Sequence, residues 1–148
     1  MTIFIGADHR GYQLKDNIIE YLQSKNIRVE DLGNYEYDPE DNFPVYANKV
    51  AEAVLQYPED YLGIVICGSG AGVCIAANRH KGIYCMIGFD VDQVKSARAH
   101  DHVNVLALAA DHTDIDKAHE LVDAFIETEL NTQEKYLKRL EMVDGVTS

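Results

Sequence analysis

The chain has 148 residues, 47% of them hydrophobic, and its 13 basic and 25 acidic side chains give it a formal charge of −12. This length fits one domain with an apolar core of ordinary size, so we expect a single domain over residues 1–148. The acidic balance argues against nucleic acid or an anionic membrane surface as the main partner. No apolar run approaches the roughly 18 residues of a membrane span, and no signal peptide is visible. The 3 cysteines form no CxxC pair, which argues against a disulfide framework and for a cytoplasmic protein.

Short apolar runs alternate with amphipathic segments along the chain. The apolar runs are typical of buried parallel strands and cover Thr2–Gly6, Ile27–Leu32, Leu62–Cys67, Ile83–Ile87 and Val103–Ala107. Longer segments repeat apolar residues with the period of a helix, in stripes that begin at Leu14, Ala47 and Ala118. We also expect shorter helices over Gly68–His80 and Val91–Ala99, and a surface loop over the acidic segment Asn34–Asn42.

This alternation predicts an α/β fold, because right-handed crossovers between parallel strands place helices on both faces of a sheet. We expect a three-layer α/β/α sandwich around a Rossmann-like, five-stranded parallel sheet. Residues 132–148 have no strand left to join, and we expect an additional C-terminal helix over Thr132–Val143, followed by a tail. Such a segment either packs on a partner subunit or stays a fraying local helix, and we expect the first.

The densest chemistry follows the third predicted strand, where the chain reads Cys67-Gly68-Ser69-Gly70-Ala71-Gly72. Ligands of parallel α/β sheets bind at the carboxyl ends of the strands, and a glycine-rich turn into a helix leaves N–H groups free to hold an anion. The thiolate is favoured there, so Cys67 is a candidate base, and Ser69 adds a hydroxyl. The alternative is a small buried hydrophobic residue, which the neighbouring glycines disfavour for Cys67 but which we keep for Cys74 and Cys85.

This loop does not match a nucleotide-binding motif. A GxGxxG fingerprint would need glycine where Val73 stands, and GxxxxGK[ST] is absent from the chain. The loop also follows the third strand instead of the first. An anion formed during a reaction is therefore the better ligand.

Two more polar groups are candidates for the site. Asp8-His9-Arg10-Gly11 follows the first strand, where a carboxylate and an imidazole can bind hydroxyls or phosphate, although Asp8 alone could serve as a helix cap. Ahead of the fifth strand, the stretch 99–104 holds His100, Asp101, His102 and an asparagine. So many polar groups together favour an acid–base residue over an inert loop.

The predicted C-terminal helix carries cations at Lys135, Lys138 and Arg139. They could clamp a phosphate. Their spacing alone favours a solvated helix face, with Glu134 and Lys138 paired at i and i+4.

Taken together, these motifs resemble the family of type B ribose-5-phosphate isomerases and galactose-6-phosphate isomerase subunits. The resemblance rests on Gly6–Gly11, Asp31–Gly33, Cys67–Gly72 with Ala76–Asn78, and Asn104–Leu108, and it runs from residue 2 to about residue 143. It implies an α/β/α sandwich that forms a homodimer or homotetramer with sites between subunits. It also implies the interconversion of an aldose and a ketose phosphate through a cis-enediolate, with no metal and no cofactor.

The resemblance further implies roles for single residues. Cys67 would be the base that moves a proton between C2 and C1, Ser69 would assist it, and His100 would open the furanose ring. The implied substrate-binding residues are Asp8, His9, Gly68, Gly70, Ala71, Gly72, Asp101, Lys135 and Arg139. Among them, the loop N–H groups would hold the enediolate oxyanion. His9 and the tail cations of one subunit would meet a phosphate whose sugar reaches the neighbour's Cys67.

Three positions depart from the family's pattern on the substrate side. Asp111 stands where an arginine commonly follows the fifth strand, Lys135 replaces a tail arginine, and Asp101 replaces an asparagine. Lysine keeps the charge but loses the bidentate fork of arginine. We expect ribose 5-phosphate and ribulose 5-phosphate as the substrate pair. The alternatives are an aldohexose 6-phosphate of the allose or galactose type, or a sensor that binds a sugar phosphate without turnover.

Overall fold

The computed structural model describes residues 1–145, which fold into five strands and six helices. The strands are β1 (Thr2–Ala7), β2 (Arg28–Asp31), β3 (Tyr61–Cys67), β4 (Cys85–Ile87) and β5 (Val105–Ala109). The helices are α1 (Tyr12–Ser24), α2 (Phe43–Gln56), α3 (Ala71–Asn78), α4 (Val91–Asp101), α5 (Ile115–Glu127) and α6 (Glu134–Asp144). Within this range no helix is long and apolar enough to cross a membrane.

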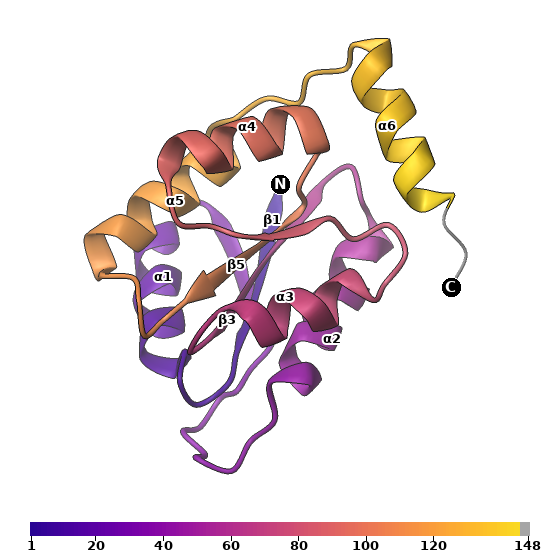
Figure 1. The fold of residues 1–148 in the computed structure, drawn as a ribbon. Coiled ribbons are helices and arrows are strands. Elements are labelled where there is room, and N and C mark those ends of the chain that lie inside the picture. Colours follow the sequence, from indigo (N-terminus) through magenta and orange to yellow (C-terminus); the bar gives the residue numbers. More distant parts are fainter. Residues whose placement is uncertain (146–148) are drawn as a thin grey trace.

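The strands form one parallel sheet in the order β2-β1-β3-β5-β4 (Figure 1). The connections from β1 and from β3 lead in opposite directions, to β2 and to β4, so these neighbouring strands form a topological switch point. Ligands of open α/β sheets bind in the crevice outside the carboxyl ends of the strands at such a point. We call the end of the sheet where β1, β3 and β5 stop the carboxyl edge, and the opposite end the amino edge.

The central strands β1, β3 and β5 are buried on both faces, as the continuous apolar runs predicted, whereas the edge strands β2 and β4 are at most half-buried. Alternate residues of β1 point to opposite sides, so Ile3 and Ile5 pack with α1, α4 and α5 while Phe4 packs with α2 and α3. The helical stripes predicted from Leu14, Ala47 and Ala118 are the buried faces of α1, α2 and α5. The predicted three-layer α/β/α sandwich with a five-stranded parallel sheet is therefore confirmed.

Several predicted boundaries were wrong by a few residues; β4, for example, begins at Cys85 instead of Ile83, and α6 at Glu134 instead of Thr132. Three of these differences bear on the site. The helix predicted from Gly68 begins only at Ala71, because Gly70 has a left-handed backbone with φ of 76°. The fifth strand begins at Val105 instead of Val103, since the Asn104 side chain is bonded to the turn before β4. Helix α4 runs on to Asp101, so the polar stretch predicted to lie between elements is largely its last turn.

Helix α6 stands apart from the sandwich (Figure 1). None of its side chains is buried, and its contacts within the chain are mainly with α4. Tyr136 stacks on His100, and Tyr84 donates a hydrogen bond to Asp144. Of the segment predicted to pack on a partner, residues 146–148 lie outside the described part of the chain.

Candidate active site at the carboxyl edge

The loops that follow β1 and β3 lie against each other at the switch point. The Asp8 N–H donates to the Ile66 carbonyl over 3.3 Å. Gly11 lies so close to β3 that a Cβ at this position would come within 2.6 Å of the Ile66 side chain. Only glycine allows this approach. The topology and this close turn therefore bring the Asp8–His9 pair and the Cys67 loop together, as their positions after two strands predicted.

The loop after Cys67 has the form of an anion cradle. Gly70 adopts the left-handed conformation at the start of α3, and the Ser69 hydroxyl accepts the Ala71 N–H over 3.2 Å. Within residues 1–145, no hydrogen bond takes up the N–H groups of Gly68, Ser69 or Gly70. Free N–H groups at a helix N-terminus favour a negative charge. This loop can hold an anion without a cationic side chain.

Cys67 is the last residue of β3 and lies directly before this cradle. The residue is 5% exposed and belongs to the apolar cluster beneath α2 and α3. Cys67 is therefore both a buried apolar residue, as the alternative interpretation held, and a neighbour of the anion cradle, as the functional interpretation requires. Its packing fixes its position, and its place next to the free N–H groups is what a base acting on a bound anion requires.

Asp8 combines burial with backbone hydrogen bonds. Its carboxylate is 6% exposed and accepts the N–H groups of Arg10 over 2.9 Å and of Gly11 over 3.2 Å. Burial raises the pKa of Asp8, and the two N–H groups counteract part of that rise. The cap considered from the sequence is wrong, because the N-cap of α1 is Gly11 and no side chain caps this helix; Asp8 instead closes the turn that precedes it. Both N–H groups bond the same carboxylate oxygen, and within the described residues no hydrogen bond engages the other one, which is available to a ligand.

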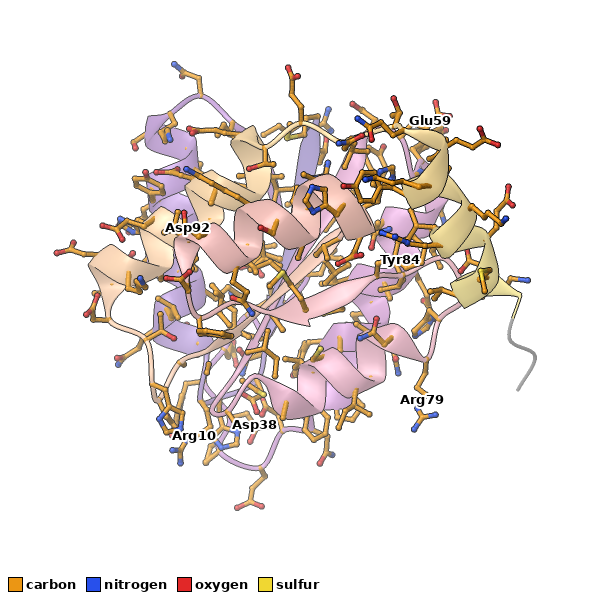
Figure 2. The ribbon with its side chains drawn as sticks, turned by 45° about the horizontal axis from the view of Figure 1, so that its top comes forward. Arg10, Asp38, Glu59, Arg79, Tyr84 and Asp92 are labelled. Atoms are coloured by element: carbon orange, nitrogen blue, oxygen red, sulfur yellow. The ribbon has the colours of Figure 1, made fainter. Side chains whose placement is uncertain are left out.

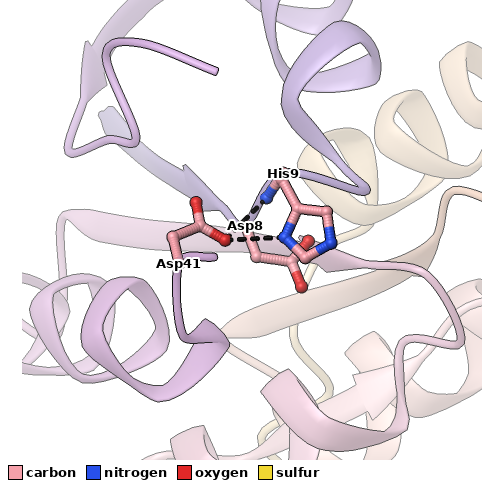
Figure 3. Close-up of side chains that lie close together, drawn as sticks. All are labelled: Asp8, His9 and Asp41. Carbon is pink, nitrogen blue, oxygen red and sulfur yellow. Dashed lines mark hydrogen bonds and ion pairs between the residues drawn. The ribbon is translucent and has the colours of Figure 1, made fainter. Parts of the chain in front are cut away.

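His9 is held by an acid from a loop that lies more than thirty residues further along the chain (Figure 3). Asp41 accepts the His9 backbone N–H over 3.0 Å and contacts the ring Nδ1 at 2.8 Å. The other Asp41 oxygen accepts the Asn34 side-chain N–H over 2.6 Å. The bond to Asp41 raises the pKa of His9, with a further contribution from the charge of Asp8. The imidazole is therefore predisposed to carry a positive charge.

Asp8, His9 and Asp41 form the one candidate cation-binding site within the described residues. Ligand atoms of Asp8, His9 and Asp41 lie within 4.8 Å of one another. The imidazole proton already compensates the charge of Asp41 through their hydrogen bond. We assign no metal to this group.

Arg10 and Asp111 form an ion pair at the rim of the same edge. The Asp111 N–H donates to the Gly68 carbonyl over 3.0 Å, which attaches the loop after β5 to the cradle. A Cβ on Gly68 would lie 2.7 Å from the Asp111 carboxylate and 3.3 Å from Arg10 Nε. The acid predicted to replace a phosphate-binding arginine is thus paired with an arginine from another strand end.

The remaining predicted residues lie elsewhere. Helix α4 leads from the carboxyl edge back to the amino edge, so His100 and Asp101 in its last turn lie at the far end of the sheet. In Figure 2, Arg10 and Asp38 lie together at one end of the molecule, away from α6 and from Tyr84 beside it. At that end, the Tyr136 ring contacts the side chains of His100, Lys135 and Arg139. We call these residues, together with Asp101, the α4–α6 group: His100, Asp101, Lys135, Tyr136 and Arg139.

This arrangement corrects the predicted grouping of His9. We expected His9 to act with the tail cations against a neighbour's Cys67. The structure places His9 on the same edge as Cys67 of its own chain, because β1 and β3 are adjacent parallel strands. The tail cations Lys135 and Arg139 lie instead with His100, where their side chains flank the Tyr136 ring.

This edge brings together a thiol beside free N–H groups, a carboxylate and an imidazole whose pKa is raised. Such a set suits proton transfer on a small anionic substrate that bears hydroxyls. The fold and this edge thus define the class of a small-molecule isomerase of the α/β type. Residues 3–143 match the model of the Ribose/Galactose Isomerase family, and the chain belongs to that family of aldose–ketose isomerases.

Known members of the family are similar along nearly the whole chain. "Probable ribose-5-phosphate isomerase B" of Mycoplasma pneumoniae is 39% identical over 127 residues, which cover 86% of this chain and 83% of the relative. "Ribose-5-phosphate isomerase B" of Mycobacterium tuberculosis is 32% identical over 143 residues, 97% of this chain and 88% of the relative. The crystal structure of the Mycoplasma genitalium ribose-5-phosphate isomerase B with bound ribulose-5-phosphate superposes with a TM-score of 0.92 at 35% identity, covering 97% of this chain and 93% of that one.

Sequence reasoning missed four residues that shape the two groups. Asp41 and Asn34 lie in a segment interpreted only as an acidic surface loop, and Tyr136 was passed over between two tail cations. Arg10 was quoted as part of a motif without a partner. Nothing in the sequence singled out these residues, since each gains its role from a contact with a distant segment.

Proposed function

We propose that this protein interconverts ribose 5-phosphate and ribulose 5-phosphate through a cis-enediolate, with Cys67 as the base. The observation that carries the proposal is the set of free N–H groups of Gly68, Ser69 and Gly70 directly after the buried cysteine. An enediolate carries negative charge on oxygen, and fixed backbone donors stabilise such charge without reorganising. A relative at 35% identity holds ribulose 5-phosphate in its crystal structure, which supports a pentose phosphate as ligand.

The reaction needs one base and one proton relay. Cys67 Sγ removes the proton from C2 of the open-chain aldose, and the electrons move into the C1 carbonyl to give the enediolate. The Ser69 hydroxyl assists transfer of a proton between the two substrate oxygens. The Cys67 thiol then returns its proton to C1, and the ketose forms. Asp8 binds the sugar hydroxyls through its free carboxylate oxygen, and His9 binds the phosphate.

The α4–α6 group completes the site from a second copy of the chain. His100 is proposed to open the furanose ring, yet within one chain it lies at the opposite end of the sheet from Cys67. A two-fold homodimer, alone or within a homotetramer, would set the α4–α6 group of each copy against the carboxyl edge of the other. Asp101, Lys135 and Arg139 of that copy would then add polar and cationic contacts to the substrate.

The function is tested by turnover without added metal, in the presence of a chelator. Ribose 5-phosphate is compared with allose 6-phosphate and galactose 6-phosphate, and we expect the highest kcat/KM for ribose 5-phosphate. A hexose phosphate with the higher value would overturn the substrate assignment. Binding of ribose 5-phosphate by a folded, reduced sample without any turnover would favour the sensor.

The shared site is tested by complementation. Copies with Cys67→Ala and copies with His100→Ala are each expected to be nearly inactive. Half of the dimers in a random mixture are mixed, and each mixed dimer has one intact site and one with both changes, so about a quarter of wild-type activity should return. A site made within one chain would give no recovery in the mixture.

A further inference from the structure

Asp41 is the most deeply buried acid in the loop between β2 and α2. Its side chain is 4% exposed, although residues 35–40 of the same loop are exposed to solvent. Removing a carboxylate from water is costly unless partners compensate its charge and fill its hydrogen bonds. The burial of Asp41 is not needed to form the sheet or its helices, so its hydrogen-bond partners indicate its role.

The partners of Asp41 fix it to the end of β1. Asn34 donates its side-chain N–H to Asp41 and its backbone N–H to the Ala7 carbonyl over 3.0 Å. Asn34 is itself 5% exposed. The carboxylate is thus tied through Asn34 to Ala7, the residue that precedes Asp8 and His9.

One Asp41 oxygen accepts both the backbone N–H and the ring Nδ1 of His9. An acceptor at 2.8 Å requires a proton on Nδ1, so only Nε2 is left to change its protonation or to meet a ligand. The His9 side chain is 25% exposed, and within residues 1–145 no hydrogen bond occupies Nε2. Figure 3 shows this nitrogen on the far side of the ring from Asp41.

We propose that Asp41 is a positioning residue for substrate binding, which holds His9 as an imidazolium with Nε2–H directed at the phosphate of the sugar phosphate. The inference rests on the proposed function and extends it, since it names the residue that keeps a positive charge on His9, the side chain proposed to bind the phosphate. Asp41 itself touches neither the phosphate nor the reacting carbons.

The other charges around His9 agree with this role. Asp8 favours the imidazolium and Arg10 opposes it, while the edge of the Tyr37 ring closes one side at 6.3 Å between ring centres. In the assembled site, Lys135 and Arg139 of a second copy would add positive charge. Asp41 provides the largest of the effects that raise the pKa of His9. Its removal should therefore lower that pKa.

The test is the pH dependence of KM for ribose 5-phosphate in wild type and Asp41→Asn. In both, KM should rise as the pH passes through the pKa of His9, because the imidazolium loses its proton there. With asparagine this rise should begin at lower pH. At pH about 5.5, below the ordinary imidazole pKa, the two KM values should agree, and between about pH 7 and 8 KM should be about tenfold higher in Asp41→Asn.

Two controls separate positioning from folding. Glu40→Gln removes a charge from the exposed neighbour and should leave the pH profile unchanged. In a His9→Gln background, Asp41→Asn should have no further effect on KM. A KM raised equally at all pH values by Asp41→Asn would mean a structural role and would overturn the proposal, as would an additive effect in the double variant.

A second readout does not depend on turnover. The titration of the His9 ring, followed by NMR with and without inorganic phosphate, should have a lower midpoint in Asp41→Asn and should rise when phosphate binds to wild type. Equal midpoints in the two proteins would refute the role of Asp41 even in an active enzyme. If wild type binds phosphate but does not turn over ribose 5-phosphate, the proposed function fails while the link between Asp41 and His9 stands.

Discussion

The two ends of this molecule are built in different ways. At the carboxyl edge the groups are fixed by the backbone, through a left-handed Gly70, a buried Cys67 and a carboxylate that accepts two N–H groups. The α4–α6 group consists of partly or fully exposed side chains around one aromatic ring. Two of them lie in the last turn of α4 and three on α6, a helix with no buried residue. The carboxyl edge is thus ready to stabilise a developing charge, whereas little within the described chain fixes the side chains of the α4–α6 group, which agrees with the proposed role of a second copy.

The largest effect is expected at the preformed end. Cys67→Ala should lower kcat by about 10²–10⁴-fold, since it removes the proposed base, while substrate affinity measured by calorimetry should change little. Cys85→Ala, a change of the same kind on β4, which β5 separates from β3, is the control and should keep most of the activity. Turnover by Cys67→Ala close to that of wild type would refute Cys67 as the base.

The sequence predicted this end well because its chemistry is local. Each residue of the cradle is a neighbour of Cys67 along the chain, and the rule that parallel strands end at one edge brought Asp8 and His9 to the same place. Strand order was not predictable in this way. The order β2-β1-β3-β5-β4 depends on which helices cover which face, and that is decided by contacts between distant segments.

The other end was harder to read for a physical reason. Helix α4 is polar on most of its surface and buries only Val94, so its extent to Asp101 leaves little trace in the apolar pattern. His100 was therefore predicted in a loop. The Asp41 contact was hidden for a related reason, because four acids lie in the segment 36–41 and only the tertiary structure distinguishes the buried one.

The next effect tests the α4–α6 group. His100→Ala should lower turnover of ribose 5-phosphate by about 10²-fold, because the ring-closed form dominates in solution, and should affect an open-chain aldose phosphate far less. Tyr136→Leu, which removes the stacked ring at 4.6 Å but keeps His100, should reproduce a smaller loss of the same kind. Equal losses on both substrates would refute the ring-opening role and leave His100 with a role in assembly only.

A smaller effect is expected from the ion pair at the rim of the carboxyl edge. Arg10→Ala should raise KM for ribose 5-phosphate about tenfold with little change in kcat, since it removes a cation that would attract the bound substrate and its transition state equally. Asp111→Asn should lower KM by about twofold, because it frees Arg10 and removes a negative charge near the phosphate. Arg28→Ala, at an exposed arginine paired with Glu30 on the edge strand β2, is the control. An unchanged KM in Arg10→Ala would leave phosphate binding to His9 and the second copy.

The smallest effect on turnover is expected at a pair of thiols away from the cradle. We interpreted Cys74 and Cys85 as small hydrophobic residues, but in the structure the Cys74 thiol donates to the Cys85 carbonyl over 3.5 Å and accepts the Asn78 side-chain N–H over 3.6 Å. The two thiols also affect each other's ionisation. The hydrogen bond from Cys85 lowers the pKa of Cys74 to about 7, and the bond to Cys74 raises the pKa of Cys85.

Cys74 should therefore react first with a thiol reagent, with a rate that rises through pH 7 instead of the ordinary thiol range near about 8.5. Peptide mapping after brief iodoacetamide treatment should find the label on Cys74, while Cys67, which is 5% exposed, reacts more slowly and is protected by ribose 5-phosphate. Cys74→Ser should keep near-normal turnover and lose the early label. Loss of activity in proportion to the labelling of Cys74 would contradict this prediction. It would mean that Cys74 contributes to turnover and is not separate from the site of Cys67.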